Sequence, residues 1–162
     1  YDAEGAWASS GEIHQPLLDD LLEDPFFTQS FPKSTGPEHF NLAWLTPKLL
    51  RHSVAPEDVQ ATLLALTTHS IAQSISMLCP SGTADIFVCG GGSKNHALMK
   101  SLQAQMSDFS VGSTALLGVD PMWVEALAFA WLAKQTMEGE PGNLAAVTGA
   151  KGARVLGGVY PA

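Results

Sequence analysis

The sequence predicts an α/β fold, and three observations support this prediction. A short apolar, β-leaning run at 85–89 stops at three glycines, 90–92. A helical pattern follows over 95–106, and a second β-like run begins at Phe109. Strand, helix and strand in succession are typical of a parallel βαβ unit. Ligands of open α/β sheets bind beyond the carboxyl ends of the strands, which is where these glycines would lie.

The composition is that of one globular domain. The chain has 162 residues, of which 46% are hydrophobic and 15% charged, and its formal net charge is −8. This length is sufficient to bury one core. No run of Lys or Arg occurs, so duplex nucleic acid and an anionic membrane are poor partners, because both require clustered positive charge. An anionic ligand would have to be held by backbone amides and a few basic residues.

Two cysteines are too few for a disulfide scaffold, and their spacing does not fit a zinc site. Cys89 lies in the apolar run before the glycines, so we expect a buried, reduced thiol and a reducing compartment. The apolar stretch 122–133 is interrupted by Glu125 and is shorter than the roughly 18–20 residues that a membrane span requires.

The first third of the chain predicts a short helix, a loop and a second short element. Leucines at 17–22 predict an amphipathic helix that Pro25 ends. Acidic residues lie between these leucines, and a solvated helix face is favoured over a metal site because calcium-loop spacing is absent. The loop at 31–41 contains Lys33, Ser34, Thr35 and Gly36, which either hold an anion or form an ordinary turn. A short element and a helical turn at 41–52 are expected to be broken by Pro47.

A longer helix is predicted from Pro56, because proline suits the first helical position and Glu57 and Asp58 complement the helix dipole. Its apolar residues drift around the helix, as expected for a helix that covers a sheet, and 80–82 should end it. The glycine-rich segment 139–162 predicts short β-like pieces at 144–147 and 155–160 in a tail that folds back.

Asp120 and Pro121 predict the start of another helix, as N-cap and first residue. Residues 122–133 are apolar all round except for Glu125, and an all-apolar helix is normally buried. Glu125 therefore either faces a cleft or reaches the surface through the first turn of the helix. A carboxylate buried without partners would cost several kcal/mol.

The glycines Gly90, Gly91 and Gly92 leave two alternatives open. One is a phosphate or nucleotide site, because glycine lets a ligand approach the backbone and the helix N-terminus favours anions. The other is a tight packing turn. The GxSxG, HExxH and Walker A patterns are absent, and Asn95 occupies the position where a dinucleotide fingerprint requires glycine. Asn95 can instead cap the helix or bind a base or ribose.

Taken together, several stretches make the chain similar to the C-terminal part of bacterial anhydro-N-acetylmuramic acid kinases. The resemblance covers essentially all of residues 1–162. The stretches that carry it are PKSTGPEHFNLAWL (32–45), EDVQATLLALTTHSI (57–71), FVCGGGSKNHALMKSL (87–102), DPMWVEALAFAWLA (120–133), GNLAAVTGA (142–150) and LGGVYPA (156–162).

The resemblance implies a lobe of the RNase H-like, actin–hexokinase–Hsp70 ATPase type, with a mixed sheet flanked by helices. It implies a cytoplasmic bacterial kinase that uses ATP and Mg²⁺ and acts as a homodimer at full length. Such an enzyme opens the 1,6-anhydro ring of its amino sugar with water and phosphorylates O6, giving N-acetylmuramic acid 6-phosphate in peptidoglycan recycling. By match, Gly90, Gly91, Gly92 and Asn95 would lie at the nucleotide and Glu125 at the sugar.

Departures from the family pattern limit what this chain is expected to do alone. Family members are roughly twice as long. Their N-terminal phosphate loop and the Asp that activates water would both precede Tyr1, and Ala145 replaces a usual proline. We therefore expect residues 1–162 to be the C-terminal lobe of a two-lobe sugar kinase, inactive alone and lacking its N-terminal lobe. The alternative is a non-catalytic nucleotide-binding or assembly module of the same ATPase superfamily.

Overall fold

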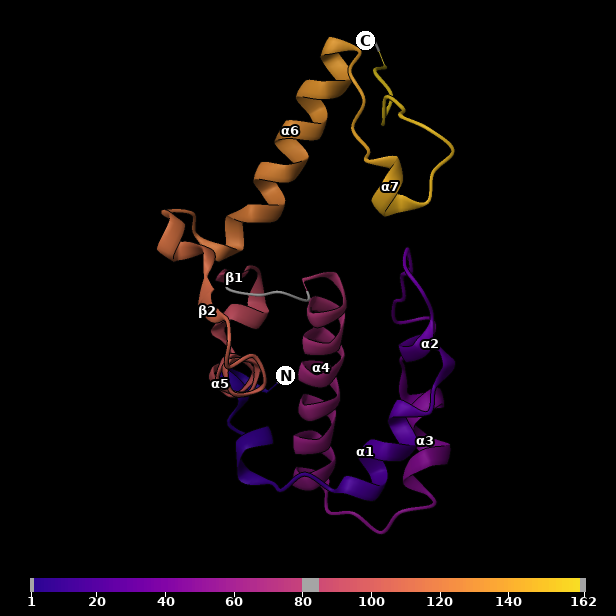
Figure 1. Ribbon diagram of the computed structural model, residues 1–162, viewed down its shortest axis with the longest axis vertical. Coiled ribbons are helices and arrows are strands. Elements are labelled where there is room, and N and C mark those ends of the chain that lie inside the picture. Colours follow the sequence, from indigo (N-terminus) through magenta and orange to yellow (C-terminus); the bar gives the residue numbers. More distant parts are fainter. Residues whose placement is uncertain (1, 80–84, 161–162) are drawn as a thin grey trace.

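The structure is a computed structural model that describes residues 2–79 and 85–160. In chain order the main elements are α1 (Gln15–Leu22), α2 (Pro25–Thr28), α3 (Leu42–Leu49), α4 (Pro56–Leu78), β1 (Asp85–Val88), α5 (His96–Gln105), β2 (Ser110–Ser113), α6 (Val124–Glu138) and α7 (Ala145–Thr148). Figure 1 shows α1 to α5 and both strands in the lower part of the molecule, called the body here. Helix α6 and the tail that follows it lie above the body.

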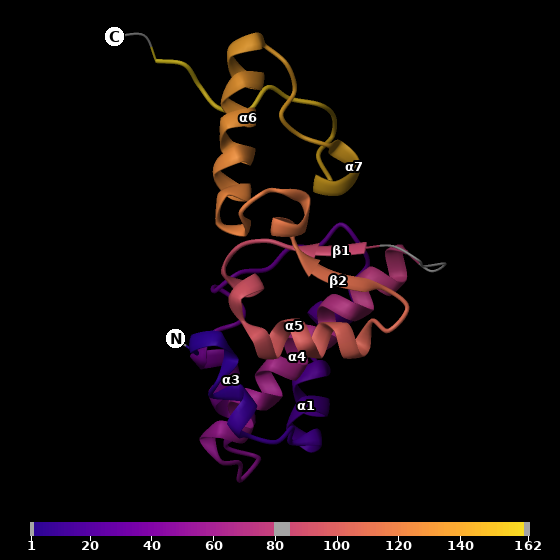
Figure 2. The same cartoon turned by 90° about the vertical axis from the view of Figure 1, so that its left-hand side faces the viewer.

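The predicted parallel βαβ unit is confirmed. Strands β1 and β2 pair in parallel, from Asp85 opposite Ser110 to Val88 opposite Ser113. Helix α5 connects them and packs against β2. In Figure 2, α5 lies between the two strands and α4. Within the described residues the sheet has only these two strands, so the larger mixed sheet stays a prediction.

Helix α4 begins at Pro56 with Glu57 and Asp58 in its first turn, as predicted. Its buried positions are mostly small residues: Ala61, Thr62, Ala65, Leu66, Thr68 and Ala72. Small side chains let neighbouring helices approach, and α4 packs mainly on α5, α1 and the short 3₁₀ helix Ala8–Ser10. It therefore covers helices rather than the sheet that we expected. The predicted stop at 80–82 lies outside the described residues.

The main core lies between α1, α3 and α4. Its buried members are Leu17, Leu18, Leu21, Leu45, Ala65 and Leu66. Each fully buried leucine contributes about 1.5–3 kcal/mol. The amphipathic α1 is confirmed, but it ends at Leu22, and Pro25 begins α2 instead of ending α1. The expected break at Pro47 is wrong, because α3 continues through it from a cap at Asn41.

The prediction that the helix at 122–133 is buried is wrong for this chain. None of the residues of α6 is buried in the described structure, and Leu127, Phe129 and Trp131 are 52%, 63% and 51% exposed. Figures 1 and 2 show the reason: α6 projects from the body, and only the tail runs beside it. The apolar composition correctly indicates a helix that requires a partner, but the body of this chain does not supply one.

Two smaller predictions also require correction. The β-like pieces of the tail are not strands: Ala145–Thr148 is the helix α7, and 155–160 has no regular structure. Cys89, which directly follows β1, is exposed rather than buried, because no residue of that strand is buried. Cys79, at the end of α4, is exposed as well. Among the described residues, no helix combines the length and the apolarity that crossing a membrane requires.

Candidate functional site

The glycine turn lies at the carboxyl end of β1. Gly90 has φ +71° and ψ −167°, a conformation that residues with a side chain rarely adopt. Gly91–Lys94 then forms one turn of 3₁₀ helix. The Ser93 hydroxyl donates to the Gly90 carbonyl at 2.7 Å, and the Asn95 amide donates to the Gly92 carbonyl at 3.0 Å. These bonds stabilise the turn.

The outer side of this turn is open. A Cβ built on Gly90 or on Gly91 would have no atom of the described chain within 4 Å, and one on Gly92 would meet only Leu98 Cδ2 at 3.7 Å. Side-chain packing therefore does not require glycine at 90 or 91, but the backbone conformation of Gly90 by itself favours glycine, so the tight turn and the ligand site both stay open as alternatives. The space lets another molecule approach the backbone. An open backbone at the end of parallel strands is suited to binding an anionic or nucleotide ligand.

Asn95 acts as a helix cap in this structure. Its Oδ1 accepts a hydrogen bond from the Leu98 amide at 2.9 Å, which satisfies a free N–H at the start of α5. The side chain also lies against Gly5, where an added Cβ would sit only 2.2 Å from Oδ1. The capping alternative is thus confirmed. A contact of Asn95 with a nucleotide stays a prediction.

The glycine turn is joined to the start of α6. The Gly90 amide donates to the Pro121 carbonyl at 2.8 Å, and Asp120 caps the following turn by accepting from the Met122 amide at 2.9 Å. Glu125 lies in the first turn of α6, on the helix that this bond connects to the glycines. Its side chain is exposed and makes no hydrogen bond or ion pair within the described residues. Among the described residues Glu125 thus reaches the surface through the first turn of α6, which is the second of the two alternatives, and a contact with the sugar stays a prediction.

Lys33, in the loop that we considered for anion binding, is used internally. Its ammonium donates to the carbonyls of Phe26 at 2.9 Å and Phe27 at 3.2 Å, and it lies 4.7 Å from the centre of the Phe26 ring. Lys33 thus satisfies carbonyls of α2. Beside it, a Cβ on Gly149 of the tail would come within 3.2 Å of Pro32. This geometry favours a structural role for the loop, and an anion site there stays a prediction.

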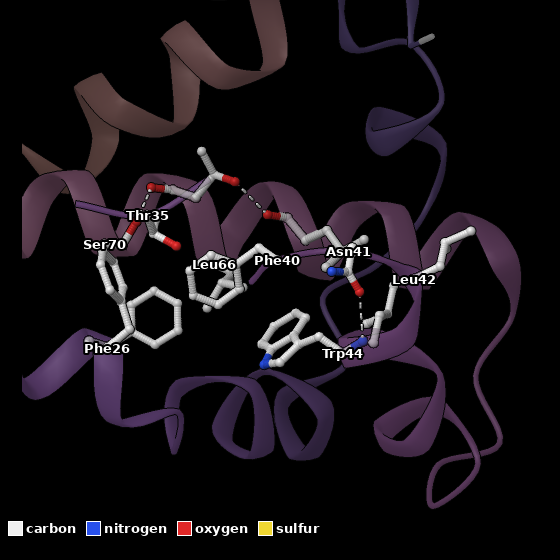
Figure 3. A pocket seen from close by; sticks show the side chains of 12 residues that line it. Phe26, Thr35, Phe40, Asn41, Leu42, Trp44, Leu66 and Ser70 are labelled. Atoms are coloured by element: carbon white, nitrogen blue, oxygen red, sulfur yellow. Dashed lines mark hydrogen bonds between the residues drawn. The ribbon is translucent and has the colours of Figure 1, made fainter. Parts of the chain in front are cut away.

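A pocket that the sequence analysis missed lies on the other side of α4 from α5. Its volume is about 510 Å³, and Figure 3 shows Phe26, Phe40 and Trp44 around it. Two of the polar groups at its rim are already bonded: the Asn41 side chain accepts from the Trp44 amide at 3.1 Å, and the Ser70 hydroxyl donates to the Thr67 carbonyl. The sequence feature that could have indicated this pocket is the density of aromatic residues between 26 and 44. In the structure their rings contact one another from Phe26 through Phe40 to Trp44.

The acidic cluster of α1 is not only a solvated face. Asp20 pairs with Arg51 at 2.6 Å, Lys48 at 3.0 Å and His52 at 3.0 Å. The hydrogen bond from Arg51, aided by those from Lys48 and His52, outweighs burial and holds the pKa of Asp20 well below its usual value of 3.8.

Asp24, at the other end of the cluster, is also bonded rather than free. Burial by itself raises the pKa of its carboxyl, but bonds from the Phe26 amide, His39 and Trp44 leave that pKa below its usual value. Both carboxylates therefore hold α1, α2 and α3 together. Across residues 2–79 and 85–160, no group of three or more His, Cys, Asp or Glu side chains is placed to hold a metal ion.

The comparison with protein families decides what this chain is related to. The family model described as anhydro-N-acetylmuramic acid kinase matches residues 1–162. The chain belongs to the anhydro-N-acetylmuramic acid kinase family. The resemblance inferred from the sequence motifs is thereby confirmed.

Curated relatives carry the name anhydro-N-acetylmuramic acid kinase. The chain is 54% identical to that of Pseudomonas syringae pv. tomato, 51% to that of Shewanella sp. (strain MR-7) and 49% to that of Nitrosomonas europaea. Each match includes 100% of this chain and 44% of the relative. The chain thus spans less than half the length of these anhydro-N-acetylmuramic acid kinases.

Proposed function

We propose that this chain is one part of an ATP-dependent kinase that opens 1,6-anhydro-N-acetylmuramic acid with water and phosphorylates O6. The product is N-acetylmuramic acid 6-phosphate, as expected in peptidoglycan recycling. The observation that carries the proposal is the family match over all 162 residues, together with the open glycine turn at the carboxyl end of β1. The chain would be the C-terminal lobe of a two-lobe enzyme with the actin–hexokinase–Hsp70 type of architecture.

In this proposal the glycine turn contacts the nucleotide. The backbone at Gly90, Gly91 and Gly92 lets the adenosine or the phosphates of ATP approach closely, because among the described residues only the Leu98 side chain lies near the Cβ position of any of the three. The turn is held by its own hydrogen bonds before the ligand arrives, so less conformational entropy is lost on binding. Asn95 supports the site by capping the helix that follows the turn.

Glu125 would bind the sugar. Its carboxylate is exposed and lies on the helix whose start is bonded to the Gly90 amide, so nucleotide and sugar groups could meet near this junction. A carboxylate accepts hydrogen bonds from sugar hydroxyls. Phosphoryl transfer depends mainly on positioning and on charge stabilisation, which an arrangement of this kind supplies in part.

The general base and the ligands of Mg²⁺ are assigned to the rest of the protein. The described residues provide no set of carboxylates that fits a magnesium ion, so we derive no step through the metal from this chain. The chain also spans only 44% of its relatives. We therefore expect it to bind but not to catalyse alone.

A second function is consistent with the same open glycine turn. A non-catalytic nucleotide-binding or assembly module of the same superfamily would use this turn to bind a nucleotide without phosphoryl transfer. Calorimetry separates the two functions if it compares the isolated chain with a single-chain hybrid, in which residues 1–162 replace the matching part of the P. syringae relative.

The kinase proposal predicts that the hybrid binds ATP and that the anhydrosugar changes this binding. Tight ATP binding by the isolated chain, in a defined oligomer and with no effect of the sugar on the hybrid, would favour the module instead.

A further inference from the structure

The pocket beside α4, called the aromatic pocket here, has the size and the lining of a small-molecule site. Its volume is about 510 Å³, and two of its lining residues, Leu45 and Leu66, belong to the buried core. Sites for small molecules are typically concave, mostly apolar and roughly 300–1,000 Å³ in volume, with a few polar groups that orient the ligand. The glycine turn and Glu125 do not line this pocket, so the contacts proposed above leave it unused.

The aromatic wall of the pocket is held from behind by one carboxylate. Asp24 does not line the pocket, and its side chain is only 9% exposed. It accepts hydrogen bonds from the Trp44 indole N–H at 2.8 Å and from the Phe26 amide at 2.9 Å. The Phe40 ring contacts both neighbours edge to face, with its centre 5.4 Å from that of Phe26 and 4.8 Å from that of Trp44. The wall is therefore in place before a ligand arrives, and less conformational entropy is lost on binding.

The opposite wall, formed by α4, offers hydrogen-bond acceptors. The Thr67 hydroxyl donates to the Leu63 carbonyl at 2.9 Å, and the Ser70 hydroxyl donates to the Thr67 carbonyl at 2.9 Å. Each hydroxyl thus uses its only proton within the helix, and what remains for a ligand is an oxygen lone pair. The Asn41 amide at the rim donates to two carbonyls of its own loop. A ligand that bonds α4 must therefore bring the donor.

Charge is kept out of the aromatic pocket. Among the described residues, none of those that line it is ionisable. An ionised ligand would lose its hydration there without gaining a counter-ion, which excludes phosphates and carboxylates. A sugar with many hydroxyls would leave several of them without a partner. An aromatic ring, in contrast, pairs favourably with the rings of the wall, either stacked or edge to face.

We propose that the aromatic pocket binds an uncharged small molecule that combines an aromatic ring system with one hydroxyl or N–H donor. The ring system lies between the aromatic wall and α4, and its donor bonds the hydroxyl oxygen of Thr67 or Ser70. Figure 3 shows Phe26, Phe40 and Trp44 beside the part of α4 that carries Leu66 and Ser70. This site is additional to the nucleotide and sugar contacts of the proposed function.

Three compounds that share one ring system test this chemistry on the unmodified chain. 2-Naphthol carries a hydroxyl donor, naphthalene carries none, and 2-naphthoate is negatively charged at pH 7. In NMR titrations we expect 2-naphthol to bind about three- to tenfold more tightly than naphthalene, which is the gain that one hydrogen bond supplies. We expect 2-naphthoate to bind about tenfold or more weakly than naphthalene, because the pocket provides no counter-ion. Nuclear Overhauser contacts from 2-naphthol to the Phe40 and Trp44 rings should place it in the pocket.

Variants of α4 separate the donor contact from the space in the pocket. Thr67→Val combined with Ser70→Ala removes both hydroxyls and should lower the affinity for 2-naphthol to that for naphthalene, without changing the latter. Ser70→Trp should fill the pocket and abolish the binding of both compounds. Ser76→Trp is the matched control, because Ser76 lies exposed on the same helix and does not line the pocket.

Several results would overturn the proposal. No binding of 2-naphthol, or equal affinity for the three compounds, would show that the pocket does not select for a donor and against charge. Equal binding by Ser70→Trp and Ser76→Trp would place the ligand elsewhere. A dimer of the chain that Ser70→Trp dissociates would make a second copy the occupant. The titration is repeated on the hybrid, and binding by the isolated chain alone would show that another part of the protein covers the pocket.

Discussion

Asp20 is the residue on which the ionic contacts of the body converge. It links α1 to the end of α3 and to the turn beyond it, through Lys48, Arg51 and His52. Two of these partners, Lys48 and His52, are largely shielded from solvent, with 14% and 17% of their side chains exposed. We therefore assign Asp20 a structural role.

Asp20→Asn should destabilise the chain by about 1–2 kcal/mol near neutral pH, because it removes a charged acceptor. The pKa of Asp20 is lowered on folding, so its contribution is complete above its unfolded value near 3.8 and is lost as the pH falls through the folded value. Urea unfolding at a series of pH values should therefore show that the free energies of unfolding of the unsubstituted chain and of Asp20→Asn converge as the pH falls below about 4. Asp19→Asn is the control, because among the described residues the Asp19 carboxylate bonds only the Gln15 side chain. An equal loss of stability in both variants would contradict this account.

Gly90 is a residue at which valine tests the approach of a ligand to the backbone. Gly90 has φ +71° and ψ −167°, a region essentially restricted to glycine, whereas Gly118 has φ +78° and ψ 12° in the left-handed helical region, and an added Cβ would have open space at both. Valine should therefore cost stability at both positions, about 1–3 kcal/mol, and more at Gly90 than at Gly118. Only Gly90→Val should weaken ATP binding to the hybrid, by about tenfold or more, as measured by calorimetry. Equal ATP affinity in the two variants would remove the turn from the nucleotide site.

At the scale of elements, the sequence predicted best what local chemistry determines. Pro56 and its two following acids start α4, Asn95 caps α5 and Asp120 caps the turn before α6, as expected. Short apolar runs were ambiguous, so 144–147 was expected as a strand and forms a helix. Pro47 was expected to break α3, but the Asn41 cap and the packing of Leu45 into the core outweigh its cost.

Long-range features could not be predicted in the same way. The ion pair between Asp20 and Arg51 joins residues that are 31 positions apart in the sequence, and no local sequence pattern predicts it. The burial of α6 was inferred from its apolarity alone. Apolarity indicates that a helix needs a partner, but it does not say that the partner lies within the same 162 residues. The candidate site was predicted as a set of residues, and only the structure showed that Gly90 is bonded to the start of the helix bearing Glu125.

Helix α6 carries a prediction of its own through Glu125. Glu125→Gln should leave the melting temperature unchanged, because the side chain is exposed and unpaired in the described structure. In the hybrid it should raise the KM for the anhydrosugar by roughly 10-fold or more and leave ATP binding intact, since a charged acceptor is lost. Glu138→Gln, at the far end of the same exposed helix, is the matched control. Unchanged sugar kinetics in Glu125→Gln would exclude it from the site.

The whole molecule consists of a body with its own core and a projecting helix with its tail. The body holds the βαβ unit and the glycine turn, and the hydrogen bond from the Gly90 amide to the Pro121 carbonyl joins that turn to the short 3₁₀ turn that precedes α6. The proposed nucleotide contact is thus joined by one hydrogen bond to the segment that leads into the helix bearing Glu125. This arrangement is what we expect of one lobe of an enzyme whose ligands lie between two lobes.

Release of ADP by the single-chain hybrid tests the central claim most directly. The assay supplies ATP, Mg²⁺ and 1,6-anhydro-N-acetylmuramic acid, and it is repeated without the sugar and with residues 1–162 alone. We predict ADP release that requires the anhydrosugar, accompanied by a sugar 6-phosphate, and no turnover by the isolated chain. A folded hybrid that binds ATP but releases no ADP when the anhydrosugar is added would contradict the account.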